Sequence, residues 1–178
     1  MIYEPDEDSF LLVKQVKRLA KNKKVLDVGT GLGILAETAL KAGARDVLAA
    51  DIDKEVVEFV KDKGIKAKVS DLFSKINEKF DLIIFNPPYL PEDELEDKDI
   101  RNITTGGKHG YEILEKFLIR AKYYLNKNGE ILIVFSSLTN KEKVDSILKE
   151  NNYNFRCLET KKLFFEELYV YLIRVKEV

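Results

Sequence analysis

The sequence predicts an α/β fold in which helices cover both faces of a mostly parallel sheet. Short apolar runs typical of buried strands recur along the chain, and helical apolar patterns separate most of them. Strands joined by crossover helices pair in parallel, with a right-handed connection. The 178 residues contain no linker, repeat or low-complexity tract, so we expect one domain over residues 1–178.

The first half of the chain supplies four predicted strands. They are expected at residues 24–28, 47–50, 65–69 and 80–85. Helices are expected at residues 9–20, 32–42 and 54–63. Ser9 or Asp8 is the predicted cap of the first helix, and Gly43 and Gly64 end the other two. The segment 86–109 is predicted to be irregular.

The second half should complete a doubly wound sheet of seven strands. Helices are expected at residues 111–125 and 140–149, on either side of a fifth strand at residues 130–136. A turn at Asn126-Lys127-Asn128-Gly129 is predicted to separate the first of these helices from the strand. Two last strands, at residues 155–159 and 167–175, should pair as an antiparallel hairpin at the C-terminal edge of the sheet.

The composition excludes several classes of protein. Lysine and arginine number 30 against 31 acids, so the chain lacks the basic footprint of a general nucleic-acid binder. Cys157 is the single cysteine, which rules out an internal disulfide or a multi-cysteine zinc site and indicates a reducing cytoplasm. No apolar run approaches the ~18 residues of a membrane span, and no metal site is predicted.

A glycine-rich turn follows the first predicted strand, in "VLDVGTGLGILA" at residues 25–36. Glycines let backbone amides approach a ligand closely, and the helix behind them has a positive N-terminus. The dinucleotide fingerprint requires a third glycine at position 34, where this chain has Ile34. Asp27, inside the end of the strand, suits an ammonium group better than a pyrophosphate. These residues therefore favour a ligand other than a dinucleotide.

Two further acids follow the next strands. Asp51 can accept both hydroxyls of a ribose, and Asp71 can meet an adenine amino group, with Leu72 against the ring. Each of these acids alone could equally be a turn or helix cap. Together with Asp27 they stand at three successive strand ends, where open α/β sheets bind ligands, so a nucleoside site is predicted.

Residues 85–91, "FNPPYLP", end the fourth strand, since a proline cannot donate to a sheet. The side-chain oxygen of Asn86 and the carbonyl of Pro87 can both accept hydrogen bonds from a planar amino nitrogen and draw it toward tetrahedral geometry. The prolines fix the angle of that carbonyl, and Tyr89 offers a flat face for the acceptor. Such a site works by orientation and preorganised electrostatics rather than by a general base.

These motifs resemble class I S-adenosylmethionine-dependent methyltransferases of the N-P-P-Y group, and more narrowly the short archaeal and eukaryotic HemK-like glutamine methyltransferases. The resemblance rests on "YEPDEDSFLL" (3–12), "LDVGTGLGILA" (26–36), "DID" (51–53), "SDLF" (70–73), "FNPPY" (85–89) and "GGKHGYEIL" (106–114). It implies a Rossmann-like fold, with residues 1–22 as a helical segment that closes over the cofactor. It also implies methylation of the Gly-Gly-Gln loop of the class 1 peptide chain release factor.

The resemblance assigns site residues one by one. Cofactor binding would fall to Ser9, Asp27, Gly29, Thr30, Gly31, Asp51, Ile52, Asp71, Leu72 and Asn86. Catalysis would fall to Asn86, Pro87 and Tyr89. A small zinc-binding activator subunit would cover an apolar edge formed by Ile65, Ala67 and Val69. Independently of the resemblance, the freedom of glycine at Gly106 and Gly107 would permit a hinge or a close approach of the substrate backbone, and His109 is interpreted as a turn residue.

Alternatives of other classes stay open from the sequence. Residues 91–99, "PEDELEDKD", are acidic beside the predicted acceptor pocket, which favours a protein substrate over a phosphate backbone. An adenine-N6 methyltransferase acting on DNA or RNA is the main alternative, and a lysine acceptor is a further one. A catalytically silent subunit with the same fold is a third. A disrupted motif would support that alternative, and every motif here is intact.

Overall fold

The computed structural model describes residues 6–90 and 104–177, and within them seven strands form one sheet in the order β3-β2-β1-β4-β5-β7-β6. The strands are β1 Lys24–Val28, β2 Asp46–Asp51, β3 Ala67–Val69, β4 Phe80–Phe85, β5 Leu125–Ser136, β6 Tyr153–Lys162 and β7 Glu167–Val175. The first five are parallel, and β7 runs antiparallel to β5 and β6. The predicted sheet and its antiparallel hairpin are confirmed.

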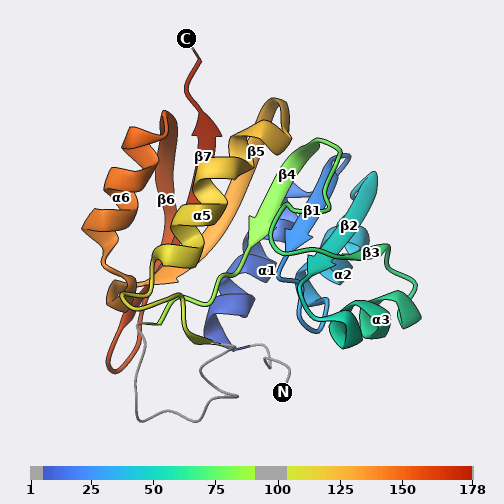
Figure 1. Cartoon of the computed structure of the whole chain (residues 1–178), viewed down its shortest axis with the longest axis horizontal. Coiled ribbons are helices and arrows are strands. Elements are labelled where there is room, and N and C mark those ends of the chain that lie inside the picture. Colours follow the sequence, from blue (N-terminus) through green and yellow to red (C-terminus); the bar gives the residue numbers. More distant parts are fainter. Residues whose placement is uncertain (1–5, 91–103, 178) are drawn as a thin grey trace.

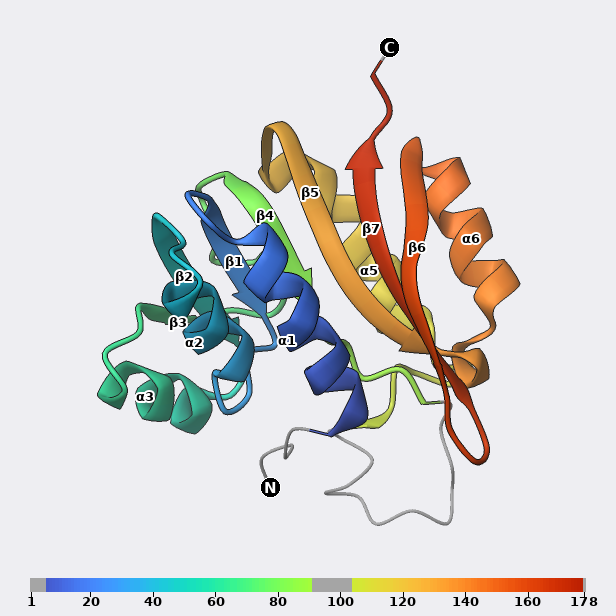
Figure 2. The same cartoon turned by 180° about the vertical axis from the view of Figure 1, so that it is seen from behind.

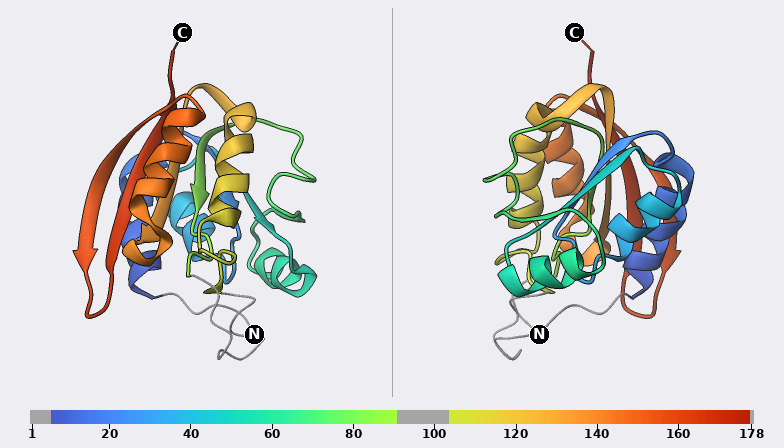
Figure 3. Two further views of the ribbon diagram at one scale, coloured as in Figure 1. Left: turned by 60° about the vertical axis from the view of Figure 1, so that its left-hand side comes forward. Right: turned by 90° about the vertical axis from the view of Figure 1, so that its right-hand side faces the viewer.

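Helices cover both faces of this sheet (Figures 1 and 2). They are α1 Glu7–Leu19, α2 Ile34–Lys41, α3 Lys54–Asp62, α5 Glu112–Ala121 and α6 Lys141–Glu150, with 3-10 turns η1 Lys122–Tyr124 and η2 Ser137–Thr139. Helices α1 and α2 lie on one face, and α5 and α6 lie on the other (Figure 3). None of the helices in the described ranges is both long and apolar enough to cross a membrane.

Two apolar cores result, one on each face of the sheet. Successive side chains of a strand point to opposite faces, so β4 contributes to both cores. Leu82 and Ile84 belong to the core beneath α1 and α2, whereas Ile83 and Phe85 belong to the core beneath α5 and α6. A strand that is apolar on both faces lies at the centre of the sheet, and its pairing with β1 and β5 fixes where its carboxyl end lies.

The cap of α1 differs from the prediction. The helix begins at Glu7, and the side chain of Asp6, rather than that of Asp8 or Ser9, accepts the hydrogen bond from the Glu7 amide at 2.8 Å. Asp8 and Ser9 are the second and third residues of the helix and are both buried. Their side chains contact residues that follow β4, so packing rather than capping determines their position.

The boundaries around β3 and β5 also differ from the prediction. The strand expected at residues 65–69 begins at Ala67, and Ile65 is buried in the core instead of forming an exposed edge. The turn expected at residues 126–129 is absorbed as an irregularity of β5, between the pairs Phe80–Leu125 and Leu82–Glu130. The Asn126 amide donates to Asp81 Oδ1 at 2.8 Å, which holds this segment against the sheet.

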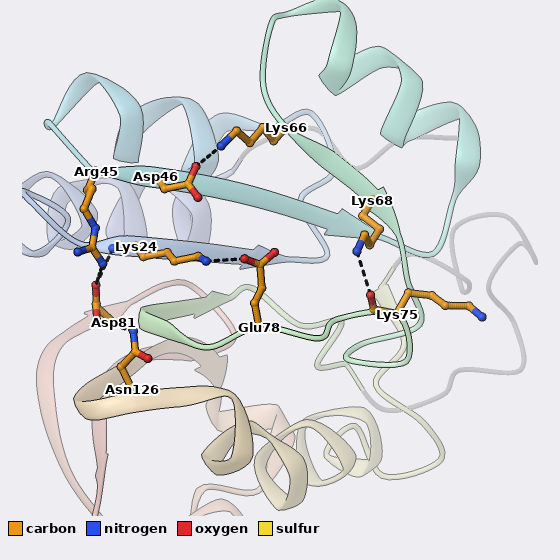
Figure 4. A network of polar contacts seen from close by, with 9 residues as sticks. All are labelled: Lys24, Arg45, Asp46, Lys66, Lys68, Lys75, Glu78, Asp81 and Asn126. Atoms are coloured by element: carbon orange, nitrogen blue, oxygen red, sulfur yellow. Dashed lines mark hydrogen bonds and ion pairs between the residues drawn. The ribbon is translucent and has the colours of Figure 1, made fainter.

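A polar network joins the amino ends of the strands (Figure 4). Asp81 accepts hydrogen bonds from the Lys24 backbone N–H at 2.8 Å and from Arg45 at 3.0 Å. Burial by itself would raise the pKa of Asp81, but the hydrogen bonds and the nearby cations outweigh it and hold that pKa below its usual value. Lys66 pairs with Asp46 at 2.6 Å, so the β3 edge carries charge at its start. These contacts stabilise the amino end of the sheet, opposite the carboxyl end where the predicted site residues lie.

Candidate active site

The carboxyl ends of β2, β1 and β4 lie side by side, and the predicted site residues follow them. Val28, at the end of β1, pairs with Ala50 of β2 and with Phe85 of β4. Asp27, Asp51 and Asn86 are therefore brought to one edge of the sheet, although they come from three separate segments. Asp71 follows β3, which pairs with β2 through Asp51 and Val69. The structure thus gathers the predicted cofactor and acceptor residues at the same edge.

Asp27 is a fully buried carboxyl group with one free oxygen. Its Oδ2 accepts hydrogen bonds from the Thr30 hydroxyl at 2.6 Å and from the Ala36 amide at 3.1 Å. Its Oδ1 has no hydrogen-bond partner among the described residues. Burial raises the pKa of Asp27 to about 7, against the lowering effect of those two hydrogen bonds. A buried carboxylate with an unused oxygen fits a positively charged donor such as an ammonium group.

The glycine turn between β1 and α2 lies beside this carboxyl group. Gly29 and Gly31 adopt left-handed conformations, with φ of 63° and 51°, which cost other residues roughly 1–2 kcal/mol. A Cβ atom added to Gly31 would have no described atom within 4 Å, so space remains there for a ligand. The Gly31 amide donates to Asp51 Oδ2 at 3.0 Å, and the Thr30 hydroxyl is used by Asp27. The Thr30 hydroxyl therefore orients the Asp27 carboxyl group, and its predicted contact with a cofactor stays a prediction.

The residues predicted to bind a nucleoside, which follow β2 and β3, are partly or fully exposed to solvent. Asp51 is half-buried and accepts a second hydrogen bond, from the Asp53 amide at 3.1 Å, so its oxygens keep lone pairs for further donors. Ile52 is 69% exposed, and Asp71 is also exposed. Leu72 holds an unusual left-handed backbone with φ of 47°. Such strain in a bulky residue is typical of functional sites.

Asn86 and Ser9 meet where α1 crosses the carboxyl end of β4. The Asn86 Nδ2 donates to Ser9 Oγ at 3.2 Å. This orients the amide, and the opposite atom, Asn86 Oδ1, is buried without a hydrogen-bond partner in the described part of the chain. The arrangement leaves this oxygen available to accept a hydrogen bond that no described residue donates.

Tyr89 is anchored at both ends. Its hydroxyl donates to Asp8 Oδ2 at 2.9 Å, and its carbonyl accepts a hydrogen bond from the Thr139 hydroxyl at 2.9 Å. Asp8 is only 4% exposed. These contacts of Asp8 and Thr139 with the acceptor motif are not predictable from the sequence, because an acid in the first turn of a helix is common and gives no sign of a partner so far along the chain.

The segment after residue 103 braces the motif from the other side. Leu90 and Thr105 form a parallel bridge, and the Gly106 amide donates to the Leu90 carbonyl at 2.9 Å. A Cβ atom on Gly106 would lie 2.1 Å from the Gly110 carbonyl oxygen and 2.6 Å from that of Pro88. Gly106 is therefore packed closely against the protein's own backbone, and the predicted hinge or approach of a substrate backbone stays a prediction.

His109 has a local structural role among the described residues. Its Nδ1 lies 2.7 Å from Glu112 Oε1, and its ring stacks on Tyr111 with centroids 5.5 Å apart. The acidic segment expected beside the acceptor pocket, residues 91–99, lies outside the described residues.

Comparison with known proteins places the chain in a family. Residues 3–165 match the family model of the Methyltransferase small domain. A putative protein N5-glutamine methyltransferase of Methanocaldococcus jannaschii is 39% identical over 177 residues, covering 95% of this chain and 89% of that protein. The methyltransferase HEMK2 of Mus musculus is 29% identical over 166 residues, covering 83% of this chain and 78% of that protein.

Among solved structures, a chain of the E. cuniculi Mtq2-Trm112 complex, which is responsible for methylation of the translation termination factor eRF1, matches with a TM-score of 0.81. Its sequence is 27% identical, and the match covers 98% of this chain and 99% of that one. The family match extends over nearly the whole described structure and includes every motif discussed above. The chain belongs to the Methyltransferase small domain family.

Proposed function

We propose that this protein transfers a methyl group from S-adenosylmethionine to the side-chain amide nitrogen of a glutamine, in the Gly-Gly-Gln loop of a class 1 peptide chain release factor. The observation that carries this proposal is the buried, unpartnered Asn86 Oδ1 at the end of β4. The names of its relatives support the choice of glutamine and of a release factor. Adenine-N6 methylation of a nucleic acid is the outcome that would displace it.

The described residues fit S-adenosylmethionine as the cofactor. Asp27 Oδ1 would accept from its ammonium group, and the open space above Gly31 would take the methionine portion. Asp51 would accept from the ribose hydroxyls, and the exposed Ile52 would lie near the adenine with Asp71 and Leu72. When bound, the cofactor supplies an electrophilic methyl group on a positively charged sulfur.

On the acceptor side, the residues need only orient the glutamine amide, and no general base is required. Asn86 Oδ1 and the Pro87 carbonyl would accept the two N–H groups of the glutamine amide, which draws its nitrogen lone pair out of conjugation. The lone pair so exposed would be directed at the methyl group that the bound cofactor supplies, and one of the two N–H protons would leave to solvent. Ser9 holds Asn86 in place through the Nδ2 contact at 3.2 Å. The flat ring of Tyr89 would carry the planar amide.

Cofactor affinity should rise with pH as Asp27 ionises. Its pKa of about 7 in the free protein should fall in the complex, because the ammonium group stabilises the carboxylate. Binding below pH 7 then releases a proton, so the Kd should fall by up to roughly tenfold per pH unit between about pH 5.5 and 7. Titration calorimetry at several pH values measures this. Asp27→Asn should bind weakly with no such slope, and a wild-type Kd constant over this range would contradict the assignment.

Asp8 should act on the reaction through Tyr89. Asp8→Ala and Tyr89→Phe each remove the 2.9 Å hydrogen bond, and each should slow turnover by less than about tenfold. Because both substitutions break the same contact, the double variant should be no slower than the slower single one. Initial rates and the cofactor Kd are measured for all three variants. Additive losses would show that Asp8 has a separate role. Tyr89→Ala, which removes the ring itself, should be far slower than Tyr89→Phe.

The partner and the compartment are part of the same proposal. We infer that a small zinc-binding activator subunit covers the β3 edge, since β3 is an edge strand of the sheet in the described part of the chain and Val69 there is 41% exposed. The solved complex of Mtq2 with Trm112 supports a small partner. A release factor acts in translation, so the protein would work in the cytoplasm. Val69→Lys should abolish co-purification with such a subunit and leave the isolated chain folded.

The acceptor class is tested with S-adenosylmethionine labelled in its methyl group. The protein, alone and with an activator subunit, is incubated with separate pools of release factor, DNA and RNA. We expect label in the release factor alone. Label in either nucleic acid and none in the release factor would reject the proposed function.

A further inference from the structure

The turn between β6 and β7 exposes two adjoining aromatic side chains. Phe164 is 91% exposed and Phe165 is 85% exposed, and their rings pack edge to face with centroids 4.6 Å apart. Single exposed apolar residues are ordinary on protein surfaces, but a protruding aromatic pair is typical of an interaction site. We call Phe164 and Phe165 the aromatic tip.

Folding does not account for the aromatic tip. The Leu163 amide donates to the Glu166 carbonyl at 2.8 Å, so Phe164 and Phe165 are the two central residues of a tight hairpin. Such loops favour glycine, asparagine or aspartate with positive φ, because that geometry matches the twist of the strands. Neither phenylalanine has positive φ, and neither is buried. Their size and apolar character therefore contribute nothing to the turn itself.

The aromatic tip lies at the same end of the sheet as the candidate active site. Leu168 of β7 pairs with Ser136 at the carboxyl end of β5, so the turn before β7 extends past that edge. Figures 1 and 3 show the β6–β7 turn at the end toward which β4 points. Any molecule that brings an acceptor group to Asn86 approaches from this end.

Hydrogen bonds and an ion pair also join the β6–β7 hairpin to the elements that hold Tyr89. The Glu167 amide donates to the Ser137 hydroxyl at 3.0 Å, and Thr139 of the same 3-10 turn donates to the Tyr89 carbonyl. Lys161 of β6 pairs with Glu7, the residue before Asp8. The hairpin base is thus fixed to both elements that frame the acceptor motif, which makes the aromatic tip a rigidly placed arm beside it.

We propose that the aromatic tip docks on the methyl-accepting protein, in an apolar depression of its folded surface next to the glutamine loop. This proposal rests on the proposed function. Aromatic side chains dominate the binding energy of protein interfaces, and a rigid arm loses little freedom on binding. The residues flanking the tip are mixed in charge, Lys161 and Lys162 on one side and Glu166 and Glu167 on the other, which favours a protein over a phosphate backbone or a membrane.

The test replaces both rings in the full-length protein. The variant carrying Phe164→Ala and Phe165→Ala should fold normally, since both side chains are exposed. With intact release factor its KM should rise at least tenfold, while kcat at saturation and the cofactor Kd stay unchanged. With a short peptide that carries only the Gly-Gly-Gln loop, its KM should equal that of the wild type. Tyr123→Ala is the matched control, because Tyr123 is 66% exposed in η1, at the opposite end of the sheet.

The other outcomes separate the two proposals. If the wild type methylates the release factor and the double variant has the same KM, the docking proposal is wrong and the proposed function stands. An equal rise in KM with the short peptide also overturns docking outside the loop. If light scattering shows a wild-type dimer that the double variant cannot form, the tip binds a second copy instead. If the wild type transfers no methyl group to the release factor, both proposals fail.

Discussion

Asn86→Ala should slow methyl transfer by about 10²–10³-fold, the scale found on losing one preorganised polar group. The free Oδ1 of Asn86 is the acceptor that would strengthen its hydrogen bond as the glutamine nitrogen becomes tetrahedral and gains positive charge. An interaction that strengthens only in the transition state lowers kcat, whereas uniform binding appears in KM. Single-turnover rates with saturating substrates measure the chemical step.

Two controls accompany the Asn86 variant. Its cofactor affinity should hardly change, because Asp27 and Asp51 lie on other strands and keep their contacts. Asn86→Asp keeps an acceptor oxygen at the same place and should be faster than Asn86→Ala. An Asn86→Ala protein that folds, binds cofactor and turns over at the wild-type rate would mean that the paired prolines merely end β4.

Gly106→Ala should lower turnover by on the order of 10²-fold, the cost of a misplacement of ~1 Å at a reacting group. The added Cβ would lie 2.1 Å and 2.6 Å from two backbone carbonyl oxygens, those of Gly110 and Pro88, and backbone cannot turn aside as a flexible side chain can. The strain should shift the loop that carries Pro87 and Tyr89. Steady-state kinetics, read together with thermal unfolding, separates this shift from a loss of fold.

Gly64→Ala is the matched control for Gly106→Ala. Gly64 follows α3, and a Cβ atom there meets no described atom within 4 Å, although its φ of 80° disfavours alanine. Gly64→Ala should therefore lower stability without changing the turnover of the folded protein. If Gly106→Ala folds and retains wild-type turnover, the brace on the motif is not needed for catalysis.

The sheet and its ligand-binding edge could be predicted from the sequence because both depend on local patterns. The apolar run of β4 and the glycine turn after β1 each specify one element, and a parallel sheet brings their carboxyl ends together. The same patterns single out Asp27 and Asn86, and in the structure each has a buried side-chain oxygen without a hydrogen-bond partner among the described residues.

The features that the sequence does not predict depend on contacts between distant segments of the chain. Asp8 and Tyr89 are 81 positions apart, and no periodicity or spacing indicates that pair. The apolar character of Ile65 suited an exposed edge as well as a core, and only the packing of α3 against the sheet decides that it is buried. The turn at residues 126–129 had ordinary turn residues, but the contact between Asn126 and Asp81 keeps that segment in β5.

The most direct test of the central claim is tandem mass spectrometry of the release factor after reaction with methyl-labelled S-adenosylmethionine. The arrangement of Asn86 and Pro87 predicts one labelled methyl group, on the side-chain amide nitrogen of the glutamine in the Gly-Gly-Gln loop. Label confined to another residue of the release factor, or found only on adenine when nucleic acid is supplied, would contradict it.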